Sequence, residues 1–462
     1  MKQPGGFLTM RRGGGLIAAL AAVCLSHAAS AQVMMQGPGP GSFGAAPSDS
    51  SAPERQSVLQ RPDPDYAPLG ITAGSFLVFP SASVTESYNS NVYAIPSPGV
   101  KGDFFTDVAP AVSMASNWNN NALNFTAGGD MKRYDTLVSE NVTNANAATN
   151  GRLDILRDVY LTGGLSYQLA HEDRASPNSI IDQKNPTQYQ VGGAGLSYVQ
   201  DPGRLGLRID GTVNYFTYNN AQTETGTTII ETDRNRIEYT LRPRVFYEIV
   251  PGYQAFVQLQ ANERDYQSQF DQFGIPRTSH GYEADAGTAV DISHVITGEV
   301  FAGYLKQYYS TNFVPTPENP QPIGMPPSIG GMGFGGNLLW NVTEITSVRL
   351  TFSRTVQETI ISNSVGTSVA DAASDLETQA GVTFEHALRR NVILTAGALY
   401  IHDDFVGVGQ WDDAYEGDAG AKYLLNRNLS AGLNVSYRKR NSNIPGFDYV
   451  GEVVMATLGT QF

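Results

Sequence analysis

Cysteine is almost missing from this sequence. Its 462 residues contain one, Cys24, and that residue lies in an N-terminal segment that we predict to be removed, so the remaining chain has no disulfide. Basic residues are also scarce: the sequence has 30 Lys and Arg but 44 Asp and Glu. This acidic balance argues against nucleic acid as a partner and against a polybasic membrane anchor.

Long hydrophobic runs are absent as well. Beyond the N-terminus, no segment carries the roughly 20 consecutive apolar residues that a transmembrane helix needs. By contrast, Gly (48), Tyr (23) and Phe (20) are abundant, and charged residues make up only 16%. This composition fits either a soluble β-protein or a membrane β-barrel, and the periodicity of the sequence has to decide between them.

The N-terminus has the features of a secretory signal peptide. A basic stretch at residues 2–12 precedes an apolar run at residues 16–25, which is too short to span a bilayer as an anchoring helix. A small-residue Ala-Ser-Ala sequence follows. We therefore predict that residues 1–31 are a signal peptide, with cleavage between Ala31 and Gln32.

Two further regions follow the signal peptide. Residues 32–70 are rich in Pro, Gly, Ser and Gln and show no period, which predicts a flexible leader. From residue 71 to residue 462 the sequence keeps one character, with no second boundary. We interpret this region as a single domain.

That character is a two-residue alternation in long segments, clearest at residues 235–250. The apolar face holds Ile237, Tyr239, Leu241, Val245 and Tyr247, and the other face holds Arg236, Glu238, Arg242, Arg244 and Glu248, with Phe246 as an exception. Such alternation predicts a β-strand with one apolar and one polar surface. Soluble strands usually have about five or six residues, whereas a tilted membrane strand needs about nine to eleven, as these segments do.

The connections between these segments alternate in length. Eight short turns alternate with nine longer polar stretches, near residues 93–103, 135–143, 173–185, 219–233, 267–279, 311–327, 360–374, 403–413 and 441–448. Short turns on one side and long loops on the other are typical of an even-stranded outer-membrane barrel. The prediction is an all-β fold, a transmembrane antiparallel up-and-down β-barrel of about 18 strands (16–18). Tyr and Trp near the strand ends either form interfacial girdles or reflect ordinary strand propensity.

A barrel of this size encloses an aqueous channel. Because an Arg facing lipid at the midplane costs about 2–4 kcal/mol, we expect the charged strand residues to face the lumen. The predicted pore-lining residues are Arg208, Asp210, Arg236, Glu238, Arg242, Arg244, Glu248, Arg349 and Arg354. They either select solutes or, more simply, pair as Arg–Glu ladders that brace the wall. The Pro-rich loop at residues 311–327 is a candidate constriction.

No catalytic or cofactor site is predicted. The sequence has no Gly-x-Ser-x-Gly elbow and no zinc-ligand spacing. Acidic neighbours follow His171 and His402, which could suggest a hydrolase, but each cluster more simply begins a solvated loop. Oxygen ligands for a loop cation could come from Asp403, Asp404, Asp412 and Asp413. Their spacing does not match a dedicated loop, so no metal is predicted.

The C-terminal segment, residues 450–462, is amphipathic and ends in Phe462. This ending resembles the signal by which bacterial outer-membrane proteins are recognised for barrel assembly, although Thr460 stands where that pattern usually has an apolar residue. The resemblance implies the barrel-assembly machinery as a partner, together with outer-membrane lipid and lipopolysaccharide as surroundings.

The start of the domain resembles the putative β-barrel porin 2 family. In that family, a Tyr-x-Pro-x-Gly motif and then a Gly-Ser-Phe motif precede the first strand. The residues here that match the family are Tyr66, Pro68, Gly70, Gly74, Ser75, Phe76 and Pro80. Ser90 stands where the family often has Asp, and the resemblance continues through residues 107–134 and 151–176. Members often occur with exopolysaccharide or capsule assembly machinery, so the resemblance implies an outer-membrane exit for a polymer beside a periplasmic polysaccharide export protein. A diffusion porin for small solutes and a non-conducting structural barrel are the alternatives.

Overall fold

The computed structural model describes residues 56–462 apart from 62, 181, 311, 313, 317, 318, 320–327, 366 and 367. The predicted signal peptide, its cleavage site and the first part of the predicted leader lie outside the described residues. In the part of the chain that is described, no helix is long and apolar enough to cross a bilayer.

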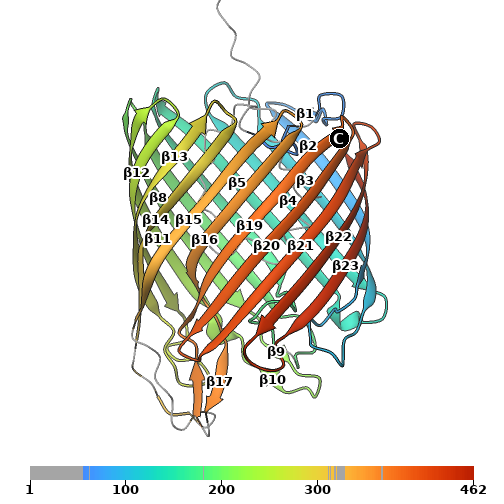
Figure 1. Cartoon of the computed structure of the whole chain (residues 1–462), viewed down its shortest axis with the longest axis vertical. Helices are drawn as coiled ribbons and strands as arrows, with labels where there is room; N and C mark the ends of the chain where they lie inside the picture. The colour runs from blue at the N-terminus through green and yellow to red at the C-terminus, as the bar shows by residue number, and fades with distance from the viewer. Residues whose placement is uncertain are drawn as a thin grey trace, which may run out of the picture.

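Eighteen strands of the described chain form one closed antiparallel barrel with strongly tilted strands (Figure 1). They are β2 (Phe76–Asn89), β3 (Asp103–Ser116), β4 (Ala122–Tyr134), β5 (Val142–Leu156), β6 (Val159–His171), β7 (Gln188–Gln200), β8 (Leu205–Tyr218), β11 (Arg236–Val250), β12 (Tyr253–Tyr266), β13 (Ser279–Ile292), β14 (Ile296–Tyr309), β15 (Ser328–Thr343), β16 (Thr346–Gln357), β19 (Ser374–Arg389), β20 (Val392–Val406), β21 (Gln410–Leu424), β22 (Leu429–Ser442) and β23 (Tyr449–Gln461). The predicted fold class is confirmed, at the upper end of the predicted strand count.

The barrel closes between its first and last long strands. β2 pairs with β23 from Ser81 opposite Gln461 to Asn89 opposite Val453. The hydroxyls of Thr85 and Thr457 lie 2.9 Å apart across this seam. All other barrel strands pair with their neighbours in sequence, so every strand has two partners and the wall has no open edge.

Smaller elements occupy the ends of the barrel. The short strand β1 (Ile71–Ala73) pairs with the start of β2. Two small hairpins of the described chain belong to loops: β9–β10 (Ala221–Gln222 and Thr228–Ile229) and β17–β18 (Ser362–Val365 and Ser368–Asp371). The described residues also form two single 3₁₀ turns, η3 (Val138–Glu140) and η4 (Thr232–Arg234). Figure 1 places β1 and the C-terminus at one end and the loop hairpins at the other. We call these the turn end and the loop end.

The connection predicted at residues 403–413 is shorter than expected. β20 runs to Val406 and β21 begins at Gln410, so only residues 407–409 form the turn. Gly407 (φ 109°) and Gly409 (φ 67°) adopt the positive φ values that glycine accepts without strain. The strand alternation therefore continues through residues that had been assigned to a loop.

The outer surface of the wall is apolar and the inner surface polar. On β11, Leu241, Val245 and Tyr247 are 53%, 49% and 46% exposed, while Arg242 and Arg244 between them are half-buried. The buried apolar clusters of the described residues are small and lie at the loop end, such as Ile275 with Tyr309, Ile329 and Ala373. Exposure of apolar side chains outward, without a packed centre, is the arrangement that a lipid-facing wall requires.

Candidate functional site: a lumen closed by a loop and by the leader

A cavity of about 500 Å³ lies inside the barrel toward its loop end. Its lining comes from the whole circumference, for example from Thr85 on β2, Lys132 on β4, Arg236 on β11, Glu377 on β19 and Arg438 on β22. Polar and charged side chains predominate among the residues around it. The interior of the barrel is therefore a polar lumen rather than a packed core.

The arginines predicted to line the pore mostly bind neighbouring side chains of the inner wall between β8 and β16. The contacts are Arg208–Asp210 (2.8 Å), Arg236–Glu238 (2.7 Å), Arg244–Glu299 (2.7 Å), Arg242 to Gln260 Oε1 (2.9 Å) and Arg349 to Asn337 Oδ1 (3.2 Å). Arg236 and Glu238 also line the cavity, and Glu248 lies on the same face of β11 nearer the turn end. These contacts fit the interpretation in which the charges brace the wall.

Arg354 differs from the prediction, because it lies on the outer face. Its cross-strand neighbours are Phe334 and Thr378, and it shares its side of β16 with the exposed Leu350. Alternation with Leu350 places it there, since residues an even number apart on a strand share a face. It lies three residues from the loop end of β16, where a long side chain can reach toward the membrane interface.

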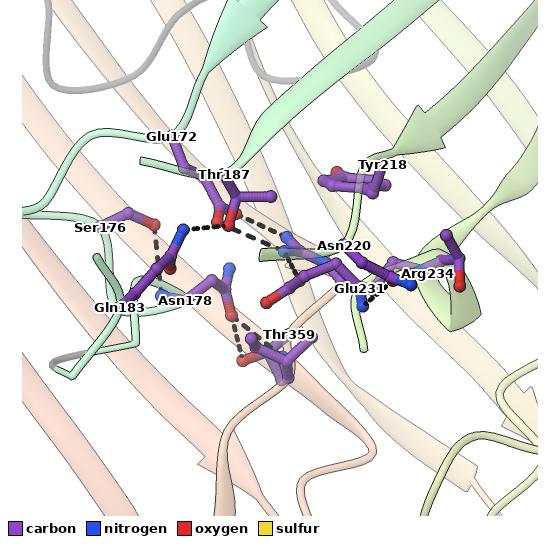
Figure 2. Close-up of polar contacts among 12 residues, drawn as sticks. Glu172, Ser176, Asn178, Gln183, Thr187, Tyr218, Asn220, Glu231, Arg234 and Thr359 are labelled. Carbon is purple, nitrogen blue, oxygen red and sulfur yellow. Dashed lines mark hydrogen bonds and ion pairs between the residues drawn. The ribbon is translucent and has the colours of Figure 1, made fainter. Parts of the chain in front are cut away.

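The β6–β7 loop, residues 172–187, reaches other parts of the wall (Figure 2). Asn178 Oδ1 accepts hydrogen bonds from Thr359 Oγ1 (2.8 Å) and Ile360 N–H (3.0 Å), which follow β16. On another side, Arg440 of β22 donates to Ala175 O (3.1 Å). Because these partners are far from β6 around the wall, the loop crosses the lumen and constricts it.

Buried ion pairs hold this constriction in place. Arg174 binds both carboxylate oxygens of Glu140 at 2.7 and 2.9 Å, and the two side chains are only 6% and 3% exposed. Arg234 lies 2.6 Å from Glu172 and 2.6 Å from Glu231, over the ring of Tyr218. Breaking a buried pair of this kind leaves an uncompensated charge, so the loop has a single strongly preferred position.

Electrostatics in the loops follow from burial and from these pairs. Burial is the largest single influence on Arg234 and opposes its charge, but Glu172, Tyr218 and Glu231 together outweigh it, and the pKa of Arg234 stands above its ordinary value. Burial raises the pKa of Glu231, which Arg234 only partly offsets. Arg234 therefore stays charged at neutral pH, whereas Glu231 takes up a proton more readily than an exposed Glu.

A second contact network joins β12 to the loop after β16. Glu358 Oε1 lies 2.5 Å from Arg264 Nη1, its other oxygen accepts the Tyr266 hydroxyl, and Arg264 also donates to Val356 O (2.7 Å). Although burial opposes it, the charge of Arg264, assisted by that of Arg236, lowers the pKa of Glu358. Glu358 is thus an ionised anchor for the loop that carries Thr359.

Changing Glu358 to Gln should destabilise the protein by about 3–5 kcal/mol at neutral pH, because the buried Arg264 loses its carboxylate partner. The lowered pKa means that this stabilisation is full above the unfolded-state pKa, about 4.3, and is lost as pH falls through the lower folded value. Urea unfolding in detergent at several pH values measures it. The wild-type advantage over Glu358→Gln should shrink below pH 4, and an advantage independent of pH would contradict the assignment. Glu224→Gln, at an exposed loop position, is the control.

The described part of the leader packs into the turn end, where a flexible segment was predicted. Val58 N–H donates to Ser347 Oγ (3.0 Å) and Leu59 N–H to Glu385 Oε2 (2.9 Å). Both acceptors lie on the inner wall and are buried. Further along, Gln461 Nε2 donates to Tyr66 O (3.3 Å). The Pro-, Gly- and Ser-rich composition of the leader suggests flexibility and does not reveal these contacts, because the hydrogen-bond partners belong to the barrel wall.

Other predicted features are distributed as follows. The candidate constriction at residues 311–327 lies largely outside the described residues, and its described residues Val314 and Asn319 contact the loop after β12 at Gly274 and Phe273. His402 faces outward and its Nδ1 lies 2.9 Å from Asp413 Oδ1, away from the inward Asp403. Phe462 N–H donates to Pro80 O (3.1 Å), and its assembly role stays a prediction.

No signal in the sequence identified the loop that constricts the lumen. Asn178 and Thr359 are 181 residues apart, and neither belongs to a recognisable motif. A search for charges in the polar loops would have found Arg174 and Arg234 as candidates for pairing. It could not have named Glu140 and Glu172 as their partners.

A closed, polar-lined, up-and-down barrel with an apolar exterior is an outer-membrane β-barrel of the porin type, with short periplasmic turns and long external loops. Its turn end therefore faces the periplasm. The chain belongs to the putative beta-barrel porin 2 family, which matches residues 63–462. This confirms the resemblance seen in the sequence.

Solved structures with similar folds are distant. Outer membrane protein OpdK of Pseudomonas aeruginosa is 10% identical, with 83% of this chain and 99% of that chain covered and a TM-score of 0.39. The siderophore receptor PiuA of Acinetobacter baumannii is 9% identical, with 88% and 85% covered and a TM-score of 0.43. OccAB4 of Acinetobacter baumannii is 10% identical, with 83% and 98% covered and a TM-score of 0.41. No curated protein matches the sequence.

Proposed function

We propose that this porin is the outer-membrane exit for an exopolysaccharide or capsular polymer. The observation that carries this proposal is a set of five tyrosines around the cavity at the loop end: Tyr134, Tyr189, Tyr218, Tyr266 and Tyr449. Sugar rings bind to aromatic faces flanked by a few polar groups. Tyr134 and Tyr189 remain half-exposed, and the rings of Tyr189 and Tyr218 stack at 5.5 Å.

A polymer needs a continuous path, so the proposal includes movement. The β6–β7 loop has to swing away from Thr359 and from the β22 arginines, and the leader has to leave Ser347 and Glu385. Water can replace the hydrogen bonds that hold the leader and Asn178, whereas displacement of the loop also has to separate the buried Arg174–Glu140 pair, so a docked partner or the polymer has to supply that free energy. A periplasmic polysaccharide export protein docking at the turn end is the partner that could release the leader.

A second candidate is a diffusion porin for small solutes. The ordered β6–β7 loop favours it, because a fixed constriction admits small molecules and excludes polymers. The wall charges near that loop would then act on passing solutes. In this case neither the loop nor the leader has to leave the lumen completely.

Deletion of the gene in its own host tests the two candidates. If the chain is the polymer exit, extracellular polysaccharide should fall to the background of a non-producing strain and polymer should accumulate in the periplasm, with recovery on complementation. Unchanged extracellular polymer would rule out export. Liposome swelling with mono- and disaccharides then measures diffusion directly, and swelling by the purified wild type together with unchanged polymer would establish the second candidate.

The same proposal covers assembly and delivery. Residues 1–31 act as a signal peptide cleaved between Ala31 and Gln32, and the terminal strand with Phe462 directs insertion by the barrel-assembly machinery. Lipopolysaccharide and outer-membrane lipid surround the wall. N-terminal sequencing of the mature protein, with Gln32 expected as the first residue, checks the cleavage.

A further inference from the structure

Four carboxylates gather on the inner wall at the loop end, outside the Arg–Glu contacts described above. Glu377 on β19 is opposite Asp403 on β20, and Asp403 is opposite Asp412 on β21. Asp375 precedes Glu377 by two residues and so shares its inward face. Each of the four residues is at most 7% exposed. Three adjacent strands thus bring together negative charges that water cannot solvate.

The spacing of three of these groups matches a single ion. One carboxylate oxygen each from Asp375, Glu377 and Asp403 can be chosen so that all lie within 4.8 Å of one another. Oxygens bound to one Ca²⁺ lie at most about 4.6–5.2 Å apart, because Ca–O distances are about 2.3–2.6 Å, so the three groups can share one ion. Mg²⁺ usually keeps several waters and binds only one or two carboxylates, whereas Ca²⁺ accepts six to eight oxygen ligands. A group of several carboxylates therefore suits Ca²⁺ better than Mg²⁺.

Two buried oxygens next to the three carboxylates, on Asp412 and Gln410, have no hydrogen-bond partner. Asp412 is fully buried and its Oδ2 accepts no hydrogen bond, although its carboxylate acts electrostatically on both Asp375 and Asp403. Gln410 is 1% exposed, and its Oε1 is equally unsatisfied while its amide nitrogen lies 3.4 Å from Asp412 Oδ1. Buried oxygens without a donor cost free energy unless a cation or an ordered water binds them.

The arginine that acts on Asp403 and Asp412 is shared with other partners. Arg440 on β22 acts on both Asp403 and Asp412, but its guanidinium donates to Phe447 O (2.9 Å) and Ala175 O (3.1 Å) and lies over the Tyr449 ring. One guanidinium held by these carbonyls faces four carboxylates. Two further arginines of the cavity lining, Arg264 and Arg277, bind Glu358 and Asp271.

We propose that Asp375, Glu377 and Asp403 bind one Ca²⁺ ion in the lumen, with Asp412 and Gln410 as further oxygen ligands or as acceptors for its bound water. The ion joins β19, β20 and β21 at the loop end, beside the loop that carries Thr359. The site is independent of what the channel transports, since binding requires only the folded barrel.

Calorimetric titration of CaCl2 into the EDTA-treated, detergent-solubilised mature protein tests the proposal. The wild type should bind one Ca²⁺ per chain, more tightly than Mg²⁺, and its thermal midpoint should rise with added CaCl2. The double variant Asp375→Asn/Asp403→Asn should lose at least tenfold in affinity. It should remain folded, because the substitutions remove repulsion, and the single variant Asp403→Asn serves in its place if it does not.

Asp404→Asn is the matched control. Asp404 neighbours Asp403 on β20 but is exposed on the outer face, so this variant should bind as the wild type does. Absence of Ca²⁺ binding by the wild type at millimolar concentration would overturn the proposal, and would mean that the carboxylates share protons instead. Retention of full affinity by the Asp403 variants, or an equal loss in Asp404→Asn, would overturn it too.

Discussion

Replacing residues 174–186 of the β6–β7 loop with a short Gly-Ser linker is expected to raise single-channel conductance severalfold. The loop crosses the lumen, so its removal widens the path at the loop end. Its anchors go with it: Arg174 leaves Glu140, and Asn178 leaves Thr359 and Ile360. Planar-bilayer recordings of the purified variant give the measurement.

Two variants make this test specific. Asn178→Ala removes one tether and keeps the loop, so it should raise conductance less and add flickering between levels. An equal Gly-Ser replacement at the exposed tip of the β2–β3 loop, residues 97–100, should leave conductance unchanged. If loop replacement left conductance at the wild-type value, the constriction would have to lie elsewhere, and the stretch at residues 311–327 would be the next to test.

Locking the leader inside the barrel is expected to have the second large effect. In Val58→Cys/Ser347→Cys, the two positions already lie in contact, since Val58 N–H donates to Ser347 Oγ at 3.0 Å. Oxidation should therefore form a disulfide with little movement of the backbone. The locked channel should conduct severalfold less than the same protein after reduction, because residues 57–61 then cannot leave the turn end.

The chain suits this experiment because Cys24 is its sole cysteine and lies in the proposed signal peptide. The single variants Val58→Cys and Ser347→Cys are the controls and should not respond to reductant. A disulfide that forms but leaves conductance the same in both redox states would show that the leader does not obstruct the path. Failure to form a disulfide would show that Val58 spends little time against Ser347.

Much of the barrel was predictable because its signals are local. Alternation of side chains along β11 and β12 identifies strands long enough to cross a membrane, and polar turn residues separate them. The exception at residues 403–413 shows the limit of composition. Four aspartates there suggested a loop, yet the strands continue, with Asp403 and Asp412 inward and Asp404 and Asp413 outward.

The sequence predicted that most charged strand residues face the lumen, but not which residues they contact. Alternation places Arg236, Arg242 and Arg244 on the polar face, and the same rule places Arg354 with Leu350 on the outer face, against the expectation that every strand Arg faces the lumen. The partners cannot be read off in the same way: Arg236 pairs with Glu238 on its own strand, whereas Glu299, the partner of Arg244, lies three strands further on. Cross-strand register sets the latter pair, and register depends on the turns and bulges of the whole sheet.

The sequence by itself determined a closed β-barrel in the outer membrane, because strand alternation and turn spacing are properties of neighbouring residues. Only the tertiary structure decided how the bore is closed and where its buried carboxylates come together. The β6–β7 loop meets Thr359, Val58 meets Ser347, and Asp375 meets Asp403 through contacts between segments far apart in the chain. Closure of the wall creates those contacts, since residues on different strands share a bore only after the first and last strands have paired.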